Sequence, residues 1–140
     1  CGLVCVCDFA VTHADSKMGF PEVDLSVCPA VVAPWLVRRV GPGAARRILL
    51  GGGLMSGADA HAAGIVTSLV PTIDALDAAV KSLVDKLLSG GPHALAATKA
   101  LLNELDGSND AASVRRGAEI SAAVIATRET QEVLRAKLGV

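Results

Sequence analysis

The chain has 140 residues, of which 51% are apolar, and a formal net charge of −1 at pH 7. This length suits a single domain with a sizeable core, and with two Phe, one Trp and no Tyr that core must be mainly aliphatic. No apolar run approaches the roughly 20 residues that cross a bilayer, and the paired arginines lack the interleaved aromatics of a nucleic-acid surface. We therefore expect a soluble globular protein that binds neither membrane nor nucleic acid.

The cysteines permit two interpretations. Cys5 and Cys7 form a C-x-C pair that could ligate a metal, but they lie in an apolar run where cysteine also serves as a small hydrophobic residue. The three histidines are distant in sequence and supply no ligand spacing, so we expect no metal site. With no secretory signal visible, we expect reduced thiols in a cytoplasmic protein.

The chain opens on Cys1-Gly2 and continues at once with the apolar run 3–7. Natural N-termini more often carry a polar, disposable lead-in, so we expect this sequence to be a piece of a longer polypeptide. The run itself is too short for its periodicity to separate a buried strand from a helix.

Two short strands are expected next, at residues 9–12 and 17–20, with a polar turn between them and Pro21 ending the second. A helix is predicted at 29–40, because its apolar residues have helical spacing and a Gly-Pro-Gly triplet follows. A second, shorter helix is predicted at 44–50 for the same reason.

The glycine triplet at 51–53 also permits two interpretations. Glycine-rich loops cradle phosphates, but no Gly-Lys-Ser/Thr follows and no strand precedes, so a helix stop and loop is favoured. Ser56, with Asp59 three residues later, forms a weak capping box for a short helix that ends at Gly64. The β-branched run 65–70 predicts a strand.

Beyond Pro71, apolar residues at helical spacing predict four helices and no strand. The expected ranges are 73–87, 92–105, 110–126 and 127–138. Alanine-rich helices of this kind pack closely. We expect them to be structural and to bury their faces on another domain or subunit as well as on each other.

Glu22 is the candidate functional residue, because it places one carboxylate in an otherwise apolar segment. General acid–base catalysis works best when the pKa of the group approaches the ambient pH, and an apolar pocket raises a carboxyl pKa in that direction. Met18, Phe20, Val23 and Val27 could supply such a pocket. From these residues alone, a surface glutamate that follows a proline is the simpler interpretation.

Four segments then carry a family resemblance. They are residues 19–25 (Gly-Phe-Pro-Glu-Val-Asp-Leu), 36–41, 50–51 and 56–66 (Ser-Gly-Ala-Asp-Ala-His-Ala-Ala-Gly-Ile-Val). In this order they resemble the second half of the crotonase superfamily, the enoyl-CoA hydratases and isomerases. The resemblance covers the whole chain, and it implies that the run 3–7 is a helix.

The resemblance implies an α/β fold. Residues 1–70 would be part of a ββα-spiral crotonase (ClpP/crotonase-like) core whose N-terminal part is missing, and residues 71–140 a C-terminal helical oligomerisation region that assembles trimers or hexamers. The substrate would be an acyl-CoA thioester, with coenzyme A as part of the substrate and no permanently bound cofactor. Its carbonyl oxygen would become an enolate held by two backbone N–H groups. Both donor positions precede Cys1 in the family, so we expect the isolated chain not to bind acyl-CoA.

Glu22 matches the family's Pro-Glu glutamate, which moves a proton near the thioester, and Met18, Phe20 and Val27 would then contact the substrate. Family hydratases carry a second glutamate at the position of Gly2, where it helps to activate water. Because Gly2 has no side chain, the resemblance favours double-bond isomerisation over hydration. The alternative is a non-catalytic relative that binds acyl-CoA or supports assembly.

Two nearby positions qualify the resemblance. Some dienoyl isomerases place an aspartate where Ala30 stands, so that chemistry is not expected. Asp24 is a second carboxylate close to Glu22, and the two would lie on the same side of the chain if the segment is extended.

Overall fold

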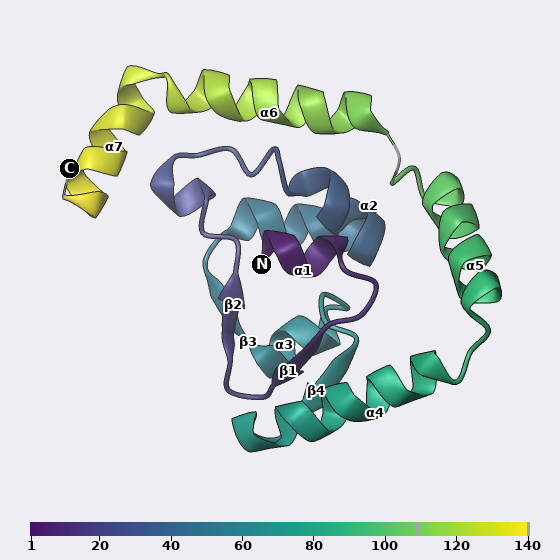
Figure 1. The fold of residues 1–140 in the computed structure, drawn as a ribbon. Helices are drawn as coiled ribbons and strands as arrows, with labels where there is room; N and C mark the ends of the chain where they lie inside the picture. The colour runs from purple at the N-terminus through teal and green to yellow at the C-terminus, as the bar shows by residue number, and fades with distance from the viewer. Residues whose placement is uncertain (109, 140) are drawn as a thin grey trace.

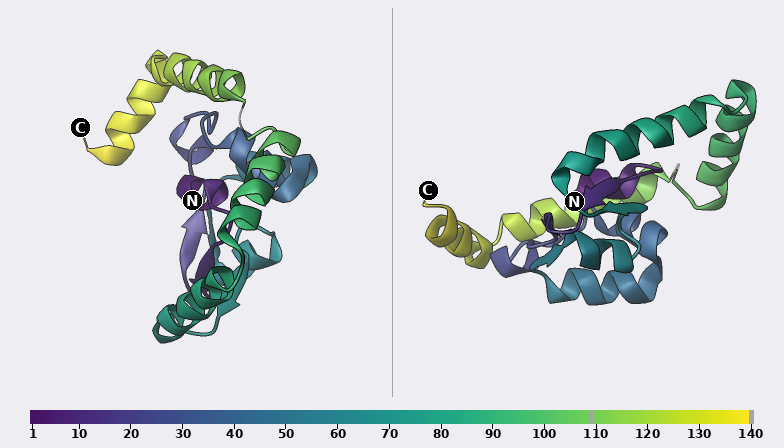
Figure 2. Two further views of the ribbon diagram at one scale, coloured as in Figure 1. Left: turned by 45° about the vertical axis from the view of Figure 1, so that its right-hand side comes forward. Right: turned by 90° about the horizontal axis from the view of Figure 1, so that it is seen from below.

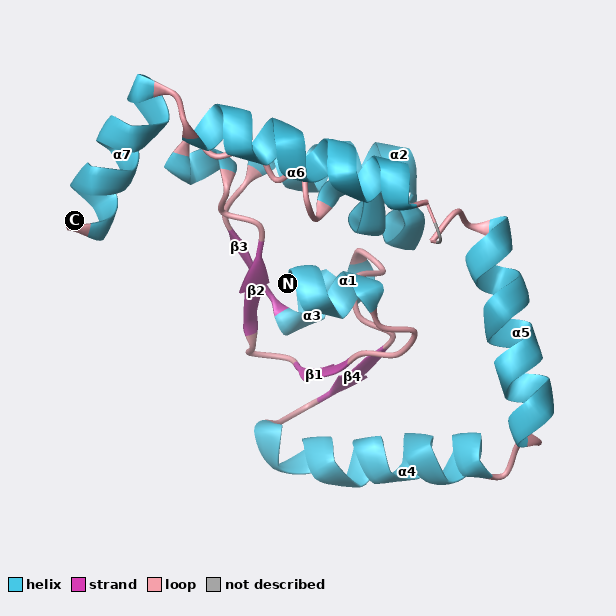
Figure 3. Ribbon diagram, turned by 45° about the horizontal axis from the view of Figure 1, so that its top comes forward, coloured by secondary structure: helices cyan, strands magenta, loops and turns pink. Residues whose placement is uncertain are grey.

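The computed structural model describes residues 1–108 and 110–139. Short strands lie among helices in a mixed α/β arrangement (Figure 3). In chain order the elements are α1 (Gly2–Val6), β1 (Val11–His13), β2 (Lys17–Gly19), the 3₁₀ turn η1 (Val23–Leu25), α2 (Ala33–Gly51), β3 (Leu54–Ser56), α3 (Gly57–Ala62), β4 (Ser68–Val70), η2 (Ile73–Ala75), α4 (Leu76–Leu88), α5 (Pro92–Leu105), α6 (Ala111–Ile125) and α7 (Arg128–Leu138).

The strands form two separate pairs. β1 pairs in parallel with β4, and β2 pairs antiparallel with β3, with Met18 opposite Met55. The sequence does not predict β3, because three residues give no measurable alternation. The strand predicted at 65–70 is also shorter than expected: Ile65 and Val66 are buried, but they lie before β4 begins.

α2 consists of two helices joined at a kink. Gly41 has the non-helical angles φ 78° and ψ 162°, so the Gly-Pro-Gly triplet ends the first helix as predicted. Pro42 then begins the second helix, where its missing N–H leaves no bond unmade. The first helix begins at Ala33, later than the predicted residue 29, and Pro34 occupies its first turn.

The core is mainly aliphatic, and it packs α1 and α2 against β2 and α3. Its largest fully buried side chains are Phe20, Leu36 and Ile65. α1 is helical, as the resemblance implies, and it turns Cys5 toward this core with 7% of the residue exposed. Cys5 therefore acts as a small hydrophobic residue, and burial raises the pKa of its thiol.

The last four helices follow one another around the periphery of α1–α3 and the strands (Figure 1). Their bounds agree closely with the four predicted helices. α4 and α5 extend away from the core (Figure 2), and neither helix, both being fully described, contains a buried residue. Leu88 and Leu105 are 77% and 74% exposed. α6 instead approaches the core closely, since a Cβ at Gly117 would lie 2.4 Å from the carbonyl oxygen of Ala30.

Side-chain caps begin α3, α6 and α7, and in α7 the cap is Thr127 Oγ1, which accepts a hydrogen bond from the N–H of Thr130 at 3.3 Å. Ser56 Oγ accepts a hydrogen bond from the N–H of Asp59 at 3.0 Å, and Asp59 Oδ2 accepts one from the N–H of Ser56 at 3.4 Å, which confirms the predicted capping box of α3. Asp110 caps α6, and hydrogen bonding from the Ser113 side chain is the main reason that the pKa of Asp110 is lowered. No helix in the described part of the chain is both long and apolar enough to cross a membrane.

Candidate functional site

The segment that carries Glu22 is a compact turn. Glu22 stands at the N-cap of η1 with the helical angles φ −58° and ψ −43°. Its carbonyl oxygen accepts hydrogen bonds from the N–H of Leu25 at 3.0 Å and of Val27 at 2.8 Å. Because the backbone is not extended here, the condition that would put Asp24 on the same side as Glu22 is not met.

The carboxyl group of Glu22 is the most unusual feature of this turn. The residue is half-buried, and its Oε2 atom is buried with no hydrogen-bond partner among the described residues. Buried carboxylate oxygens are normally satisfied, because an unpaired one loses its hydration without compensation. An unpartnered buried carboxylate oxygen therefore requires an explanation, and a site that accepts a proton is one.

The predicted neighbours of Glu22 have different environments. Phe20 is 1% exposed and lies in the core, and Met18 packs against that core. Val27 lines an apolar cavity of about 730 Å³ between η1, α2 and α6. Glu22, Met18 and Phe20 are not among the residues that line this cavity. Of the four predicted neighbours, Val23 and Val27 border this cavity, whereas Met18 and Phe20 do not.

The glycine triplet after α2 packs against the Glu22 turn. Asp24 Oδ2 accepts a hydrogen bond from the N–H of Gly53 at 2.7 Å. A Cβ at Gly52 would lie 2.7 Å from Val23 Cγ2 and 2.8 Å from Asp24 Oδ1. The triplet is a helix stop, as predicted, because the N–H of Gly52 caps α2 on the carbonyl oxygen of Ile48. The close approach to η1 is an additional role that the sequence does not reveal.

α7 also contacts the Glu22 turn. Thr130 Oγ1 donates a hydrogen bond to the carbonyl oxygen of Ser26 at 2.8 Å, and Lys137 Nζ donates one to the carbonyl oxygen of Asp24. These partners are 104 and 113 positions apart in sequence. Sequence reasoning missed both residues, since a threonine and a lysine on an amphipathic helix carry no signal of a distant partner.

Gly2 is the first residue of α1, at the position where the resemblance implies a second glutamate in hydratases. A Cβ added there would meet Val32 Cγ2 at 3.6 Å, an ordinary van der Waals distance. The position therefore has room for the first atom of a side chain, so the packing does not require glycine.

A second, polar cavity of about 520 Å³ lies between α1, α2 and α5. Two arginines line it, and their buried Arg38 Nη1 and Arg39 Nη2 atoms have no hydrogen-bond partner among the described residues. Their other nitrogens join distant segments: Arg38 donates to Gly107 at 2.6 Å and Arg39 to Ile65 at 2.7 Å. We interpret both arginines as structural residues, because their hydrogen bonds connect α2 to the segments that contain Gly107 and Ile65.

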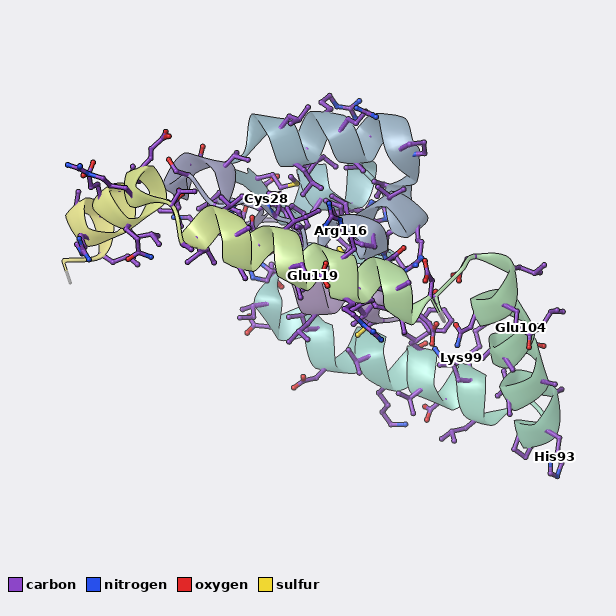
Figure 4. The ribbon with its side chains drawn as sticks, turned by 90° about the horizontal axis from the view of Figure 1, so that it is seen from above. Cys28, His93, Lys99, Glu104, Arg116 and Glu119 are labelled. Carbon is purple, nitrogen blue, oxygen red and sulfur yellow. The ribbon has the colours of Figure 1, made fainter. Side chains whose placement is uncertain are left out.

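The titratable residues of α5 lie apart from the helix that contacts the Glu22 turn. His93 and Glu104 lie on α5, at the far end of the molecule from α7 (Figure 4), and Lys99 forms an ion pair with Asp8. Across residues 1–108 and 110–139, no three His, Cys, Asp or Glu side chains gather into a group that could hold a metal ion.

Comparison with known proteins identifies the family. The family described as enoyl-CoA hydratase/isomerase matches residues 1–137, so the chain belongs to it, and the resemblance to the crotonase superfamily is confirmed. A Thermus thermophilus protein provisionally named as an enoyl-CoA hydratase is 35% identical over 135 residues, which cover 96% of this chain and 53% of the relative. The crotonyl-CoA hydratase of Syntrophomonas wolfei is 33% identical over 105 residues, which cover 74% of this chain and 40% of the relative. The chain thus spans about half the length of the curated relatives it matches.

Solved structures agree with this assignment. The crystal structure of an enoyl-CoA hydratase from Mycobacterium avium superimposes with a TM-score of 0.87 at 32% identity, over 99% of this chain and 54% of that one. An enoyl-CoA hydratase/isomerase from Pseudoalteromonas atlantica gives a TM-score of 0.85 at 22% identity, which supports the fold alone. The described residues are thus a helix-rich, partial crotonase fold.

Proposed function

We propose that the protein acts on an acyl-CoA thioester as an enzyme of the enoyl-CoA hydratase/isomerase type, with Glu22 as its proton-transfer residue. The observation that carries the proposal is the buried Oε2 of Glu22, which has no hydrogen-bond partner among the described residues. A carboxylate oxygen in that condition has free lone pairs with which to accept a substrate proton. Family membership supports the class of substrate.

The proposed reaction moves one proton between two carbons. The Glu22 carboxylate takes a proton from C2 of a 3-enoyl thioester, and the electron pair of the C–H bond delocalises onto the thioester oxygen as an enolate. The carboxylic acid then returns the proton to C4, the double bond shifts to C2–C3, and the carboxylate is regenerated. The enolate needs hydrogen-bond donors aimed at its oxygen, because stabilising developing charge is usually the largest catalytic term.

Isomerisation is proposed in preference to hydration because of Gly2. Addition of water across a double bond needs a group that activates the water as well as one that moves the proton to or from carbon. Gly2 supplies no side chain for the first task, whereas Glu22 alone is sufficient for a proton shuttle. The named relatives described above are hydratases, so this preference rests on Gly2 alone.

We propose that Met18, Phe20 and Val27 contact the acyl group. Val27 is best supported, because it borders the apolar cavity beside η1. Phe20 and Met18 would form the wall behind Glu22, since both pack in or against the core. No permanently bound cofactor enters this proposal, and coenzyme A takes part only as a portion of the substrate.

We further propose that residues 1–70 belong to the catalytic core and residues 71–140 to a helical region that assembles trimers or hexamers. The exposed leucines of α4 and α5, Leu88 and Leu105 among them, support this division, because apolar side chains in such positions gain from burial against another subunit. A cytoplasmic location remains the expectation from the reduced cysteines.

The proposal is tested with Glu22→Gln in the full-length protein, a change that removes the proton acceptor while keeping the shape of the side chain. We expect the turnover of 3-enoyl thioesters to fall about 10²–10⁴-fold, as is typical when a general base is lost. Asp24→Asn is the matched control: it makes the same chemical change two residues away and keeps an oxygen for the Gly53 N–H, so turnover should stay within about threefold. Unchanged turnover of both 2-enoyl and 3-enoyl thioesters by Glu22→Gln would remove the proposed role.

Gly2→Glu tests the preference for isomerisation. The position accepts a Cβ at an ordinary distance from Val32, so the variant should fold, and we expect it to gain hydration of 2-enoyl thioesters relative to isomerisation.

The second candidate function is that of a non-catalytic relative, and it too is favoured by the lack of a side chain at Gly2. Measurable binding of acyl-CoA thioesters with no turnover across a panel of chain lengths would support that candidate over the first.

A further inference from the structure

We propose that α7 positions Glu22 for proton transfer, with Thr130 and Lys137 as positioning residues that hold the turn from outside. This inference rests on the proposed function of Glu22. It goes further because it assigns part of the catalytic geometry to the last helix of the chain, which the family resemblance connects only with assembly.

Two side chains of α7 donate to carbonyl groups of the Glu22 segment, one within the 3₁₀ turn and one directly after it. Thr130 is 2% exposed and donates to the carbonyl oxygen of Ser26 at 2.8 Å, while Lys137 donates to the carbonyl oxygen of Asp24. The two donors are seven positions apart, or about two helical turns, so they lie on one face of α7. One face of one helix therefore holds the turn at two points.

A single rigid unit connects Thr130 to Glu22. The peptide group between Ser26 and Val27 is planar, so its C=O and its N–H move together. Thr130 binds the oxygen of this unit, and the N–H of the same unit, on Val27, donates to the carbonyl oxygen of Glu22 at 2.8 Å. A shift of the Thr130 hydroxyl is thus transmitted to the backbone of Glu22 through one peptide plane.

The backbone at this unit is strained. Ser26 has φ 57° and ψ 26°, and it is the only non-glycine residue with positive φ in the described part of the chain. A left-handed conformation is unfavourable for a residue other than glycine and persists only where its surroundings over-determine it. Here the surroundings are the hydrogen bond from the N–H of Ser26 to Val23 at 3.1 Å and the bond from Thr130 to its carbonyl.

The position of the Glu22 carboxyl group depends strongly on this backbone support. Its Oε2 has no hydrogen bond of its own among the described residues, so the position of the carboxyl group follows from the backbone turn and from packing. Errors of about 1 Å in the placement of a catalytic group can cost on the order of 100-fold in rate. Loosening the turn is therefore expected to slow the reaction without removing any group that touches the substrate.

The experiment uses Thr130→Val, which removes the hydroxyl donor and keeps the side-chain shape, and Thr130→Ser, which restores the donor. Thr67→Val is the matched control, because Thr67 Oγ1 likewise donates to a backbone carbonyl, that of Ala10 at 2.7 Å. This hydrogen bond joins the residue before β4 to the residue before β1. For all three variants of the full gene product we would measure kcat, KM, thermal stability and amide exchange at Val27.

We expect Thr130→Val to lower kcat about 10-fold or more, to leave KM within about twofold and to speed exchange of the Val27 amide. Thr130→Ser should recover most of kcat, and Thr67→Val should lose thermal stability with kcat unchanged. A wild-type kcat and a protected Val27 amide in folded Thr130→Val would overturn the proposal, as would an equal loss of kcat in Thr67→Val. Should Thr130→Val not fold, Lys137→Gln at the exposed end of α7 takes its place, with the same readouts and the same criteria.

Glu22→Gln measured in parallel separates the two levels of inference. Loss of turnover in Glu22→Gln together with normal kcat in Thr130→Val would overturn only the positioning role of α7. Normal turnover in Glu22→Gln would overturn the proposed function itself, and the exchange of the Val27 amide would then still report whether Thr130 holds the turn.

Discussion

Gly52→Ala is expected to destabilise the protein through two separate effects. Gly52 has φ 64° and ψ −157°, a region that is essentially restricted to glycine and costs about 1–3 kcal/mol for another residue. The new Cβ would also lie 2.7 Å from Val23 Cγ2 and 2.8 Å from Asp24 Oδ1, and overpacking of that kind typically costs about 1–3 kcal/mol. Together they predict a loss of about 2–6 kcal/mol in the free energy of unfolding.

Two other glycines, Gly53 and Gly43, separate the clash from the backbone strain. Gly53 also has positive φ, at 75°, but a Cβ there would have no atom within 4 Å, so Gly53→Ala should cost only the backbone strain of about 1–2 kcal/mol. Gly43 lies in α2 with open space around it and no positive φ, so Gly43→Ala should stabilise the protein by about 0.5–1 kcal/mol. The expected order of stability is Gly43→Ala, wild type, Gly53→Ala and then Gly52→Ala.

Urea unfolding followed by circular dichroism measures all three variants on one scale. A double variant, Gly52→Ala with Val23→Ala, removes the nearest clashing carbon and should recover about 1 kcal/mol relative to the sum of the two single changes. If Gly52→Ala and Gly53→Ala differ by less than about 0.5 kcal/mol, the close packing between the glycine triplet and η1 is not what requires glycine, and the reasoning fails.

The remaining predictions concern charge, thiol reactivity and ligand binding. Because the Asp110 pKa is lowered mainly by the Ser113 side chain, its contribution to stability is fully present above the ordinary aspartate pKa of about 3.9. That contribution is lost as the pH falls through the lowered pKa that Asp110 has in the folded protein. Between about pH 5 and pH 2.5, the urea midpoint should therefore fall less steeply with pH in Asp110→Asn than in the wild type. An identical slope in the two proteins would contradict this. Cys5, whose pKa is raised by burial, should react with iodoacetamide more slowly than the exposed Cys7 in native protein and at a similar rate in urea, as judged by peptide mass spectrometry. Calorimetry of the isolated 140 residues should detect no tight binding of acyl-CoA, because the two enolate-binding donors that the family resemblance implies are not among them; tight binding would refute that assignment of the donors.

Most of the local structure could be predicted from the sequence. The four terminal helices have apolar residues at regular helical spacing, and that signal depends only on neighbours within two turns. The capping box of Ser56 and Asp59 spans three residues and forms as predicted. The family was also recognisable, because several short segments agree in order over the whole chain, and Glu22 stood out as a lone carboxylate in one of them.

What the tertiary structure alone decided is the environment of Glu22. The turn's contacts with Gly53, Thr130 and Lys137 join residues 29, 104 and 113 positions apart. No periodicity or spacing encodes such pairs, because they arise when a glycine loop and the last helix pack against the same turn. The sequence by itself determined which carboxylate to examine and where the terminal helices lie along the chain. Only the folded chain determined that the segment is a strained 3₁₀ turn with one carboxylate oxygen that has no partner in residues 1–108 and 110–139, because that depends on what the rest of the chain places around it.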